Sequence, residues 1–362
     1  MGQILFTGFL FFTSTLFGQT NCVIGNAENS NSIIYNEIEV DKIIDFTKYN
    51  AIFYGEGHVR DFEPEFKFNF IKHLNNKFGV KDIFMEISYS AAYFYNLYLQ
   101  TGNSQILSDV KSIYSIGKYK SFWFNLYQFN KIKPDSSKTI IHGIDFERTE
   151  VFKLLENLKP RDILIPEYLK NTFNDISRLS RDTSLFAFDK PFETEFSKIK
   201  LALSNHENDF KLIYGHHFKT ILSVLNNKTP ITVKVIPRNK IWYKNLIEIV
   251  AENNIERFIG FFGAAHLNYE NSTSLSVKLE HNKAFQGHIL NITGIYHHFF
   301  SYGYMGDTPK IFEYGKNEKE IYNKYANKNC RATLVSTEKI HEKNINKKAD
   351  YILFAKDIVV EY

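Results

Sequence analysis

Cysteine is scarce in this chain of 362 residues, which contains only Cys22 and Cys330. There is no C-x-x-C pair and no spacing typical of a zinc site, so the common cysteine-based metal and redox motifs are excluded. A disulfide between the two residues would require an oxidising compartment. The sequence alone leaves their pairing open.

A concentrated charge of one sign is also missing. The chain has 44 Lys and Arg against 40 Asp and Glu, a net charge of +4, and both signs are interleaved along it. Nucleic-acid-binding proteins typically carry a denser basic stripe. We therefore expect a small-molecule substrate and no nucleic-acid partner, while the oligomeric state is not determined by the sequence.

Long apolar runs are limited to the first stretch of the chain, from Ile4 to Phe17. This run is shorter than the ~18 residues that a membrane-spanning helix needs. It ends at small and polar residues near Gly18, which is typical of a signal peptide, although no Lys or Arg precedes it. We predict a signal peptide at 1–19, export of the protein to the periplasm or the medium, and no stable membrane span once it is removed. A buried N-terminal helix and an uncleaved anchor are the alternatives.

The remaining residues, 20–362, repeat one pattern: a short apolar run, a polar turn and a helical stretch. Strands that alternate with helices of this length need crossover connections. The pattern therefore predicts a single α/β domain with a mainly parallel mixed sheet and helices on both faces. The region of about 149–230 reads as an almost purely helical insertion, which either roofs the site or packs as ordinary helices.

Ionisable residues follow four of the predicted strands. Glu56 and His58 come after the first strand, Glu86 ends the second, Asp145 ends the third and His266 follows the fourth. Ligands of parallel sheets bind beyond the carboxyl ends of the strands. We therefore expect Glu56, His58, Glu86 and His266 to converge in one pocket, with Arg238 and Asp145 at its rim or directly behind the residues that line it.

Each of these residues also has a structural interpretation. Glu86 lies in an apolar strand, so its carboxylate needs a partner such as Arg238 or His58. Asp145 is equally suited to capping a turn. The sequence further suggests that His142 is a core histidine and that Glu147 and Arg148 form a surface pair.

The most specific local motif is GEGHVR, which begins at Gly55. A Glu beside a His orients the imidazole and raises its basicity, which suits a general base, and the same pair supplies part of a metal site. The chain contains no G-x-S-x-G motif, and neither cysteine lies near a site segment. Both observations favour an activated water as the nucleophile.

These motifs resemble the superfamily that joins the erythromycin esterases, the ChaN-type haem-binding proteins and the Tiki/TraB metalloproteases. The resemblance covers about 51–267 and includes two helical asparagines, Asn96 and Asn245. Its segments are GEGHVRDFEPEF, FMEISYSAAYFYNLYLQTG, HGIDFER, PRNKIWYKNL and FFGAAHL. The chain departs from the esterases in having one residue, rather than two, between Glu56 and His58.

The esterase resemblance implies a hydrolase of an ester, lactone or amide that works without a metal, and the predicted signal peptide makes it an exported one. His58, oriented by Glu56, would then take the proton of water, Arg238 or His266 would stabilise the oxyanion, and Glu86 would position His266 or the water.

The other two branches imply different chemistry. The Tiki/TraB resemblance implies a metal-dependent protease, with a divalent ion held by His58, His266, Glu56 and Glu86. The ChaN resemblance implies binding of haem or another cofactor without catalysis, with Tyr54 and His58 as candidate ligands. The sequence leaves the cofactor open.

Overall fold

A computed structural model describes the chain in segments. They are 21–26, 33–57, 62–110, 113–115, 117–182, 184–185, 190–227, 235–296, 298–301, 310–313, 316–326, 330–340 and 349–355. The predicted signal peptide and His58 lie outside these residues.

A nine-stranded sheet forms the centre of the fold, in the order β2-β1-β10-β11-β7-β3-β6-β4-β5. Its strands are β1 (Asn21–Asn26), β2 (Ile33–Tyr35), β3 (Ala51–Glu56), β4 (Asp82–Ser88), β5 (Ile140–Asp145), β6 (Phe258–Gly263), β7 (Ile289–Tyr296), β10 (Ala332–Ser336) and β11 (Tyr351–Ala355). All pairings from β11 to β5 are parallel, whereas β2, β1, β10 and β11 pair antiparallel. This confirms the predicted mainly parallel mixed sheet. Strands β8 (His298–Ser301) and β9 (Lys310–Glu313) form a separate antiparallel pair.

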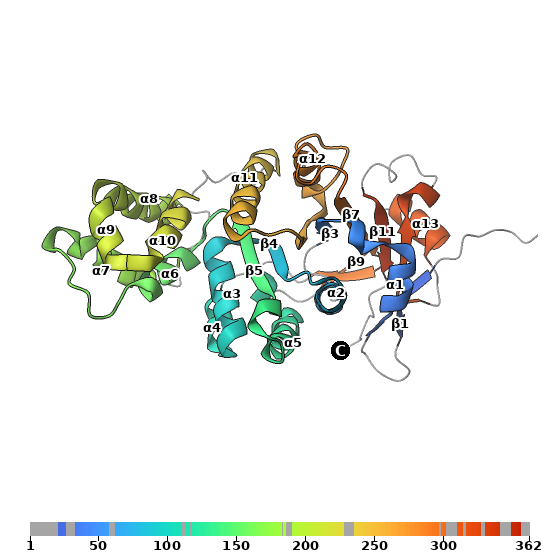
Figure 1. The fold of residues 1–362 in the computed structure, drawn as a ribbon, viewed down its shortest axis with the longest axis horizontal. Coiled ribbons are helices and arrows are strands. Elements are labelled where there is room, and N and C mark those ends of the chain that lie inside the picture. Colours follow the sequence, from blue (N-terminus) through green and yellow to red (C-terminus); the bar gives the residue numbers. More distant parts are fainter. Residues whose placement is uncertain are drawn as a thin grey trace, which may run out of the picture.

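Helices cover both faces of the sheet, as predicted (Figure 1). One face packs against α2 (Glu63–Phe78), α3 (Tyr89–Thr101) and α5 (Tyr119–Lys131), and the other against α11 (Val235–Asn253) and α12 (Leu275–Glu280). Short helices α1 (Glu37–Ile43), α4 (Gln105–Asp109) and α13 (Lys316–Tyr325) complete the fold around them. Strand β3 shows why both faces are apolar. Ile52 and Tyr54 lie in the core between the sheet and α2, whereas Ala51 and Phe53 lie in the core between the sheet and α11. Successive side chains of a strand alternate between the two faces of the sheet.

The ends of two site helices follow local signals in the sequence. Ser88 caps α3 by accepting a hydrogen bond from the amide of Ala91. Gly102 ends α3 with φ 70°, and Gly79 ends α2 with φ 69°, a left-handed conformation that glycine adopts without strain. Both helix ends therefore depend on a single glycine in the local sequence.

The region between β5 and α11 is the helical insertion. Its described helices are α6 (Glu150–Leu158), α7 (Lys170–Leu179), α8 (Lys190–Asn205), α9 (Glu207–Tyr214) and α10 (Phe218–Asn226). Figure 1 shows them as a group beside the β5 edge of the sheet. Phe152, Phe196 and Phe210 are fully buried, so these aromatic side chains form part of the core.

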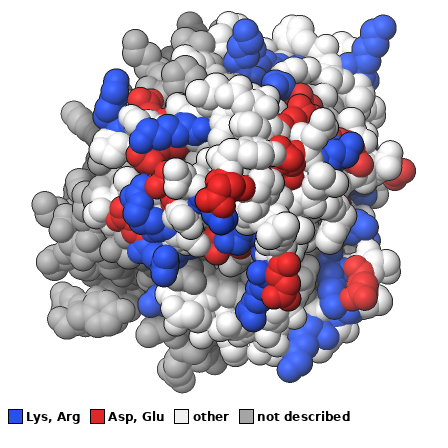
Figure 2. All heavy atoms as spheres, turned by 90° about the vertical axis from the view of Figure 1, so that its left-hand side faces the viewer, with Lys and Arg blue, Asp and Glu red and all other residues white. Residues whose placement is uncertain are grey.

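The outer face of the molecule on the side of this insertion carries Lys and Arg intermixed with Asp and Glu (Figure 2). Across the described part of the chain, none of the helices combines the length and the apolar character needed to cross a bilayer.

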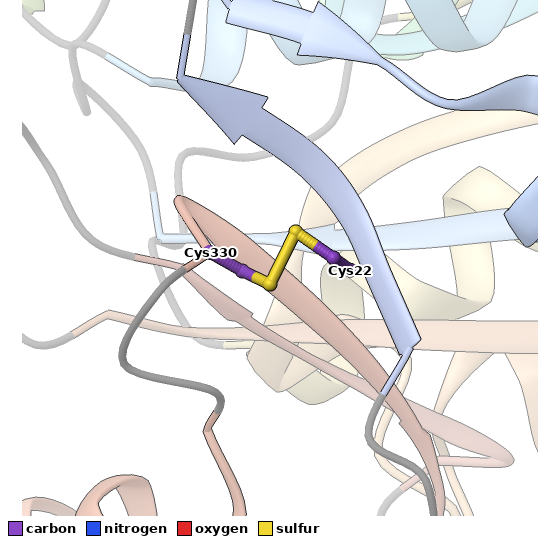
Figure 3. Close-up of a disulfide and its surroundings, with 2 residues drawn as sticks. All are labelled: Cys22 and Cys330. Atoms are coloured by element: carbon purple, nitrogen blue, oxygen red, sulfur yellow. A yellow bond between two sulfur atoms is a disulfide. The ribbon is translucent and has the colours of Figure 1, made fainter.

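The two cysteines form a disulfide. Cys22 of β1 and Cys330, just before β10, have Cα atoms 5.5 Å apart (Figure 3). The bond joins the antiparallel β1–β10 pair and closes a loop with a sequence separation of 308. It therefore links β1, near the N-terminus, to β10, a strand from the C-terminal part of the chain.

Candidate functional site

Arg238, in the first part of α11, is the centre of a buried ionic array at the ends of β4 and β5. Its Nη2 donates to Oε1 of Glu86 over 2.9 Å and to Oδ2 of Asp145 over 2.8 Å. The second oxygen of Glu86 accepts a hydrogen bond of 2.9 Å from the amide of Gly263 at the end of β6. One carboxylate thereby connects three neighbouring elements, which fixes the guanidinium in place.

One face of α11 builds the rest of this array, because Arg238, Trp242 and Asn245 are spaced at helical intervals. The indole Nε1 of Trp242 donates to Oδ1 of Asp145 over 2.8 Å. The amide of Asn245 donates to the carbonyl of Ile144 over 2.9 Å. The helix is therefore attached to the end of β5 at three positions.

His266 lies just past β6, in the single-turn helix Ala264–His266. Its Nδ1 is 2.5 Å from Oδ1 of Asn239, and its ring centroid is 4.1 Å from that of Trp242. The guanidinium carbon of Arg238 is 4.8 Å from the Trp242 ring. An imidazole and a guanidinium therefore contact the same indole, and His266 is only 5% exposed.

The charges of this array are compensated. Burial disfavours the charge of Arg238, but Asp145 and Glu86 outweigh it and raise the pKa of the guanidinium above its ordinary value. Arg148 behaves similarly. Burial opposes its charge, and Asp145, with which Nη2 makes a 3.2 Å ion pair, raises its pKa. Both cations therefore stay charged, and each buried carboxylate has a cationic partner.

Glu56 belongs to a second network, on the other face of the sheet. Its carboxylate is hydrogen-bonded to Lys67 of α2 and to the hydroxyl of Tyr114. Nζ of Lys67 also donates to Tyr119 over 2.6 Å. The structure thus brings Glu86, Asp145, Arg238 and His266 together at the α11 face, whereas Glu56 points toward α2. This partnership with Lys67 is not visible in the sequence.

The turn that begins the GEGHVR motif is held by a residue that the sequence analysis missed. Oε1 of Glu63 accepts hydrogen bonds from the amide of Gly57 over 2.8 Å and from the hydroxyl of Tyr296 over 2.7 Å. Burial is the largest effect on Glu63 and raises its pKa. Tyr54 is fully buried and hydrogen-bonded to Tyr296, so its phenol belongs to this network.

The structure tests two of the structural interpretations, a core position for His142 and a surface pair of Glu147 with Arg148. Nε2 of His142 lies 2.8 Å from Oδ1 of Asp82, and its ring stacks on Phe84, which agrees with a core histidine. The prediction that Glu147 forms a surface pair with Arg148 is wrong. Glu147 is 3% exposed and accepts a 2.5 Å hydrogen bond from the hydroxyl of Ser90. Desolvation by burial raises the pKa of Glu147 to about 7.

Asparagine side chains make hydrogen bonds along the outer edge of β5, which pairs only with β4 among the described strands. Asn96 both donates to the carbonyl and accepts from the amide of Ile141, over 2.8 and 2.9 Å. Asn227, just after the last insertion helix, donates to the carbonyl of Asp145 over 2.8 Å and is bonded to Asn245. The two asparagines named in the resemblance therefore hold the edge strand.

Gly143 of the HGID segment allows the two strands that carry Asp145 and Glu86 to approach closely. A Cβ on Gly143 would lie 2.1 Å from the carbonyl oxygen of Ser88. The β4–β5 register shifts between Met85 and Ser88 at this point. Only glycine fits here, and the irregularity lies beside Glu86.

The described members of the predicted metal-ligand set do not fit a divalent cation. Glu86 is paired with Arg238 and Glu56 with Lys67, so each carboxylate already neutralises a buried cation. Within the described ranges, no three His, Cys, Asp or Glu side chains lie close enough to hold a metal ion. The contribution of His58 stays a prediction.

Known proteins were compared with the chain at the level of sequence and of structure. No protein-family model and no curated sequence matches it. Among the solved structures that match are three with TM-scores of about 0.6. A Bacillus cereus protein has a TM-score of 0.61 at 12% identity, over 89% of this chain and 92% of its own. A succinoglycan biosynthesis protein has a TM-score of 0.60 at 12% identity, over 88% and 90%.

The third structure is a variant of the erythromycin esterase EreC in its open conformation, with a TM-score of 0.59 at 13% identity. The match covers 91% of this chain and 97% of that one. At such low identity the likeness concerns the fold and carries no residue roles. The chain therefore has the fold of the erythromycin-esterase-like proteins, which confirms at that level the resemblance seen in its motifs.

Proposed function

We propose that this protein is an exported hydrolase that cleaves an ester, lactone or amide with an activated water. The observation that carries the proposal is the contact of Arg238 and His266 with one buried indole at the carboxyl ends of β4, β5 and β6. This is where ligands of parallel sheets bind. The fold shared with an esterase supports the same reaction class.

Arg238 suits the stabilisation of an oxyanion. Its guanidinium is held by Glu86 and Asp145, so little reorganisation is needed when negative charge develops on the substrate oxygen. The two carboxylates also keep the side chain ordered before substrate arrives. A fixed donor of this kind favours the tetrahedral transition state over the flat carbonyl group.

An imidazole would take the proton of the attacking water. The sequence assigns this step to His58, which precedes α2, and His266 lies at the described part of the site. The water oxygen bonds to the carbonyl carbon as its proton moves to the imidazole. The proton then passes to the leaving oxygen or nitrogen as the scissile bond breaks.

Export is part of the proposal. Disulfides persist in secreted and periplasmic proteins and are rare where thiols are kept reduced. The Cys22–Cys330 bond is therefore the structural feature that supports the signal-peptide prediction. Mass spectrometry of protein recovered from the medium or periplasm would give the mature N-terminus, which we expect near residue 20.

The direct test is a panel of aryl esters, lactones and peptides, assayed with and without added metal. We expect turnover by the wild type and a loss of about 10²–10⁴ in kcat for His58→Ala, the usual contribution of a general base. Arg238→Met should lower kcat/KM by about 10²–10³, the effect of losing one oxyanion donor.

His281→Ala is the matched control, because His281 is an exposed histidine at the end of α12. It should retain wild-type turnover. Equal turnover by the wild type, His58→Ala and Arg238→Met on every reactive substrate would rule out the proposed mechanism. Elemental analysis of protein purified without chelator distinguishes the metal-dependent alternative, which requires a stoichiometric divalent metal.

A further inference from the structure

Asn239 is a fully buried amide in the first part of α11, next in sequence to Arg238. Its Oδ1 lies 2.5 Å from Nδ1 of His266. An amide oxygen only accepts hydrogen bonds, so this contact requires Nδ1 to carry the proton. In the neutral imidazole the lone pair is then on Nε2.

The other end of the same amide has an unusual environment. Nδ2 of Asn239 is buried and has no hydrogen-bond partner among the residues that the structure describes. An unsatisfied buried donor costs free energy of folding, which an apolar side chain at this position would avoid. The presence of an asparagine at this position is best explained by a function of its Oδ1, which contacts His266.

The packing around His266 fixes the ring in the same orientation. Trp242 lies against one side of the imidazole, and its indole is itself held by the hydrogen bond to Asp145. Asn239 and Trp242 are three residues apart on α11, so one helix supplies both contacts. Rotation of the ring would break the Asn239 hydrogen bond.

We infer that Asn239 is a positioning residue that holds His266 as the Nδ1–H tautomer, with Nε2 as a proton acceptor in the reaction. His266 is then a second proton acceptor besides His58. His58 takes one proton of the water as its oxygen bonds to the carbonyl carbon, and passes it to the leaving group as the scissile bond breaks. Nε2 of His266 takes the second proton of that oxygen, so the acid product leaves as a carboxylate. This role deepens the proposed function and rests on it, whereas the tautomer itself is independent of any activity.

Nitrogen-15 NMR of the full chain, with His266 assigned by comparison with His266→Gln, measures the tautomer directly. We expect a protonated Nδ1 and a lone pair on Nε2 in the wild type, and a loss of this preference in Asn239→Leu. A wild-type protein with the proton on Nε2 would overturn the inference.

The kinetic test uses the pH profile of kcat/KM in Asn239→Asp. A carboxylate beside the imidazole favours its protonated form, so the acid limb should move up by about one pH unit. Asn239→Leu should lose at least about tenfold in kcat/KM, the scale of a proton-transfer contribution, without a lower melting temperature.

Asn253→Asp is the matched control, because Asn253 is exposed on the same helix, 14 positions further along. That spacing corresponds to roughly 21 Å along the helix axis. Its acid limb should stay at the wild-type position. An unmoved acid limb in Asn239→Asp would overturn the role of Asn239, even if hydrolysis is observed. Failure of the whole substrate panel with the expected NMR tautomer would instead reject the hydrolase.

Discussion

Removing the Cys22–Cys330 disulfide should destabilise the fold strongly. The bond closes a loop with a sequence separation of 308, and in the chain-entropy description a loop of this length contributes about 5–6 kcal/mol. Whole domains are stable by about 5–15 kcal/mol, so a large share of the total is at stake. For a chain of 362 residues, with about 2 cal/mol/K of unfolding entropy per residue, this corresponds to a drop of about 7 °C in melting temperature.

The assay is thermal and urea unfolding of the wild type, with and without reductant, and of Cys22→Ser combined with Cys330→Ser. Cys330 is buried, so reductant should act on the wild type slowly and mainly through the unfolded state. The reduced wild type and the double variant should unfold at the same, lower temperature, and the double variant should not respond to reductant. A double variant as stable as the oxidised wild type would show that the disulfide does not stabilise the fold by lowering the conformational entropy of the unfolded chain.

Three further substitutions test the buried polar groups and the close strand approach. Burial raises the pKa of Glu147 to about 7, so the protonated carboxyl stabilises the fold below pH 4.5, and this stability is lost as the pH rises through 7. Relative to the wild type, the free energy of unfolding of Glu147→Gln should therefore increase by about 3 kcal/mol between pH 4.5 and 8, as measured by urea unfolding. Gly143→Ala would place a Cβ 2.1 Å from the carbonyl oxygen of Ser88, so we expect a loss of at least about 1–3 kcal/mol in the same assay, and wild-type stability would contradict the strand geometry. Arg238→Met removes the cation paired with Glu86 and one of the two cations paired with buried Asp145, which should cost about 3–5 kcal/mol. Wild-type stability of this variant would argue against an ionic role.

The mainly parallel sheet and the helices on both faces could be predicted from the sequence, because both depend on local patterns of apolar and polar residues. The glycines that end α2 and α3 are local signals of the same kind. The apolar runs at β3 and β6 determine the structure of their own segments, and Gly79 and Gly102 determine the helix ends that they occupy. Partners that come from distant elements were not predictable in this way. Arg148 follows Glu147 in the sequence and suggests a surface pair, yet Ser90 of α3 and Asn227, just after α10, are hydrogen-bonded to the Glu147 side chain.

The contact of Asn239 with His266 is a second one that local sequence patterns do not predict. The motif resemblance drew attention to Asn245, which holds the carbonyl of Ile144, whereas the amide that reaches His266 is six positions earlier. Both asparagines lie on α11, and only the direction of the helix relative to β5 and β6 decides which one reaches which strand. A single sequence contains no record of that direction.

The separation of Glu56 from Glu86 follows from strand register. Tyr54 of β3 and Met85 of β4 both pair with Phe261 of β6, and all three belong to the core on the α2 face. Glu56 is two positions beyond Tyr54 and therefore returns to the α2 face, whereas Glu86 is one position beyond Met85 and faces α11. Two carboxylates at the ends of β3 and β4, which lie on either side of β6, thus point to opposite faces of the sheet. The contacts of Glu56 with Lys67 and Tyr114 therefore give it a structural role on the α2 face. On this reasoning Glu56→Gln should lower stability more than Glu56→Gln combined with Lys67→Met, because the single change leaves a buried ammonium unpaired.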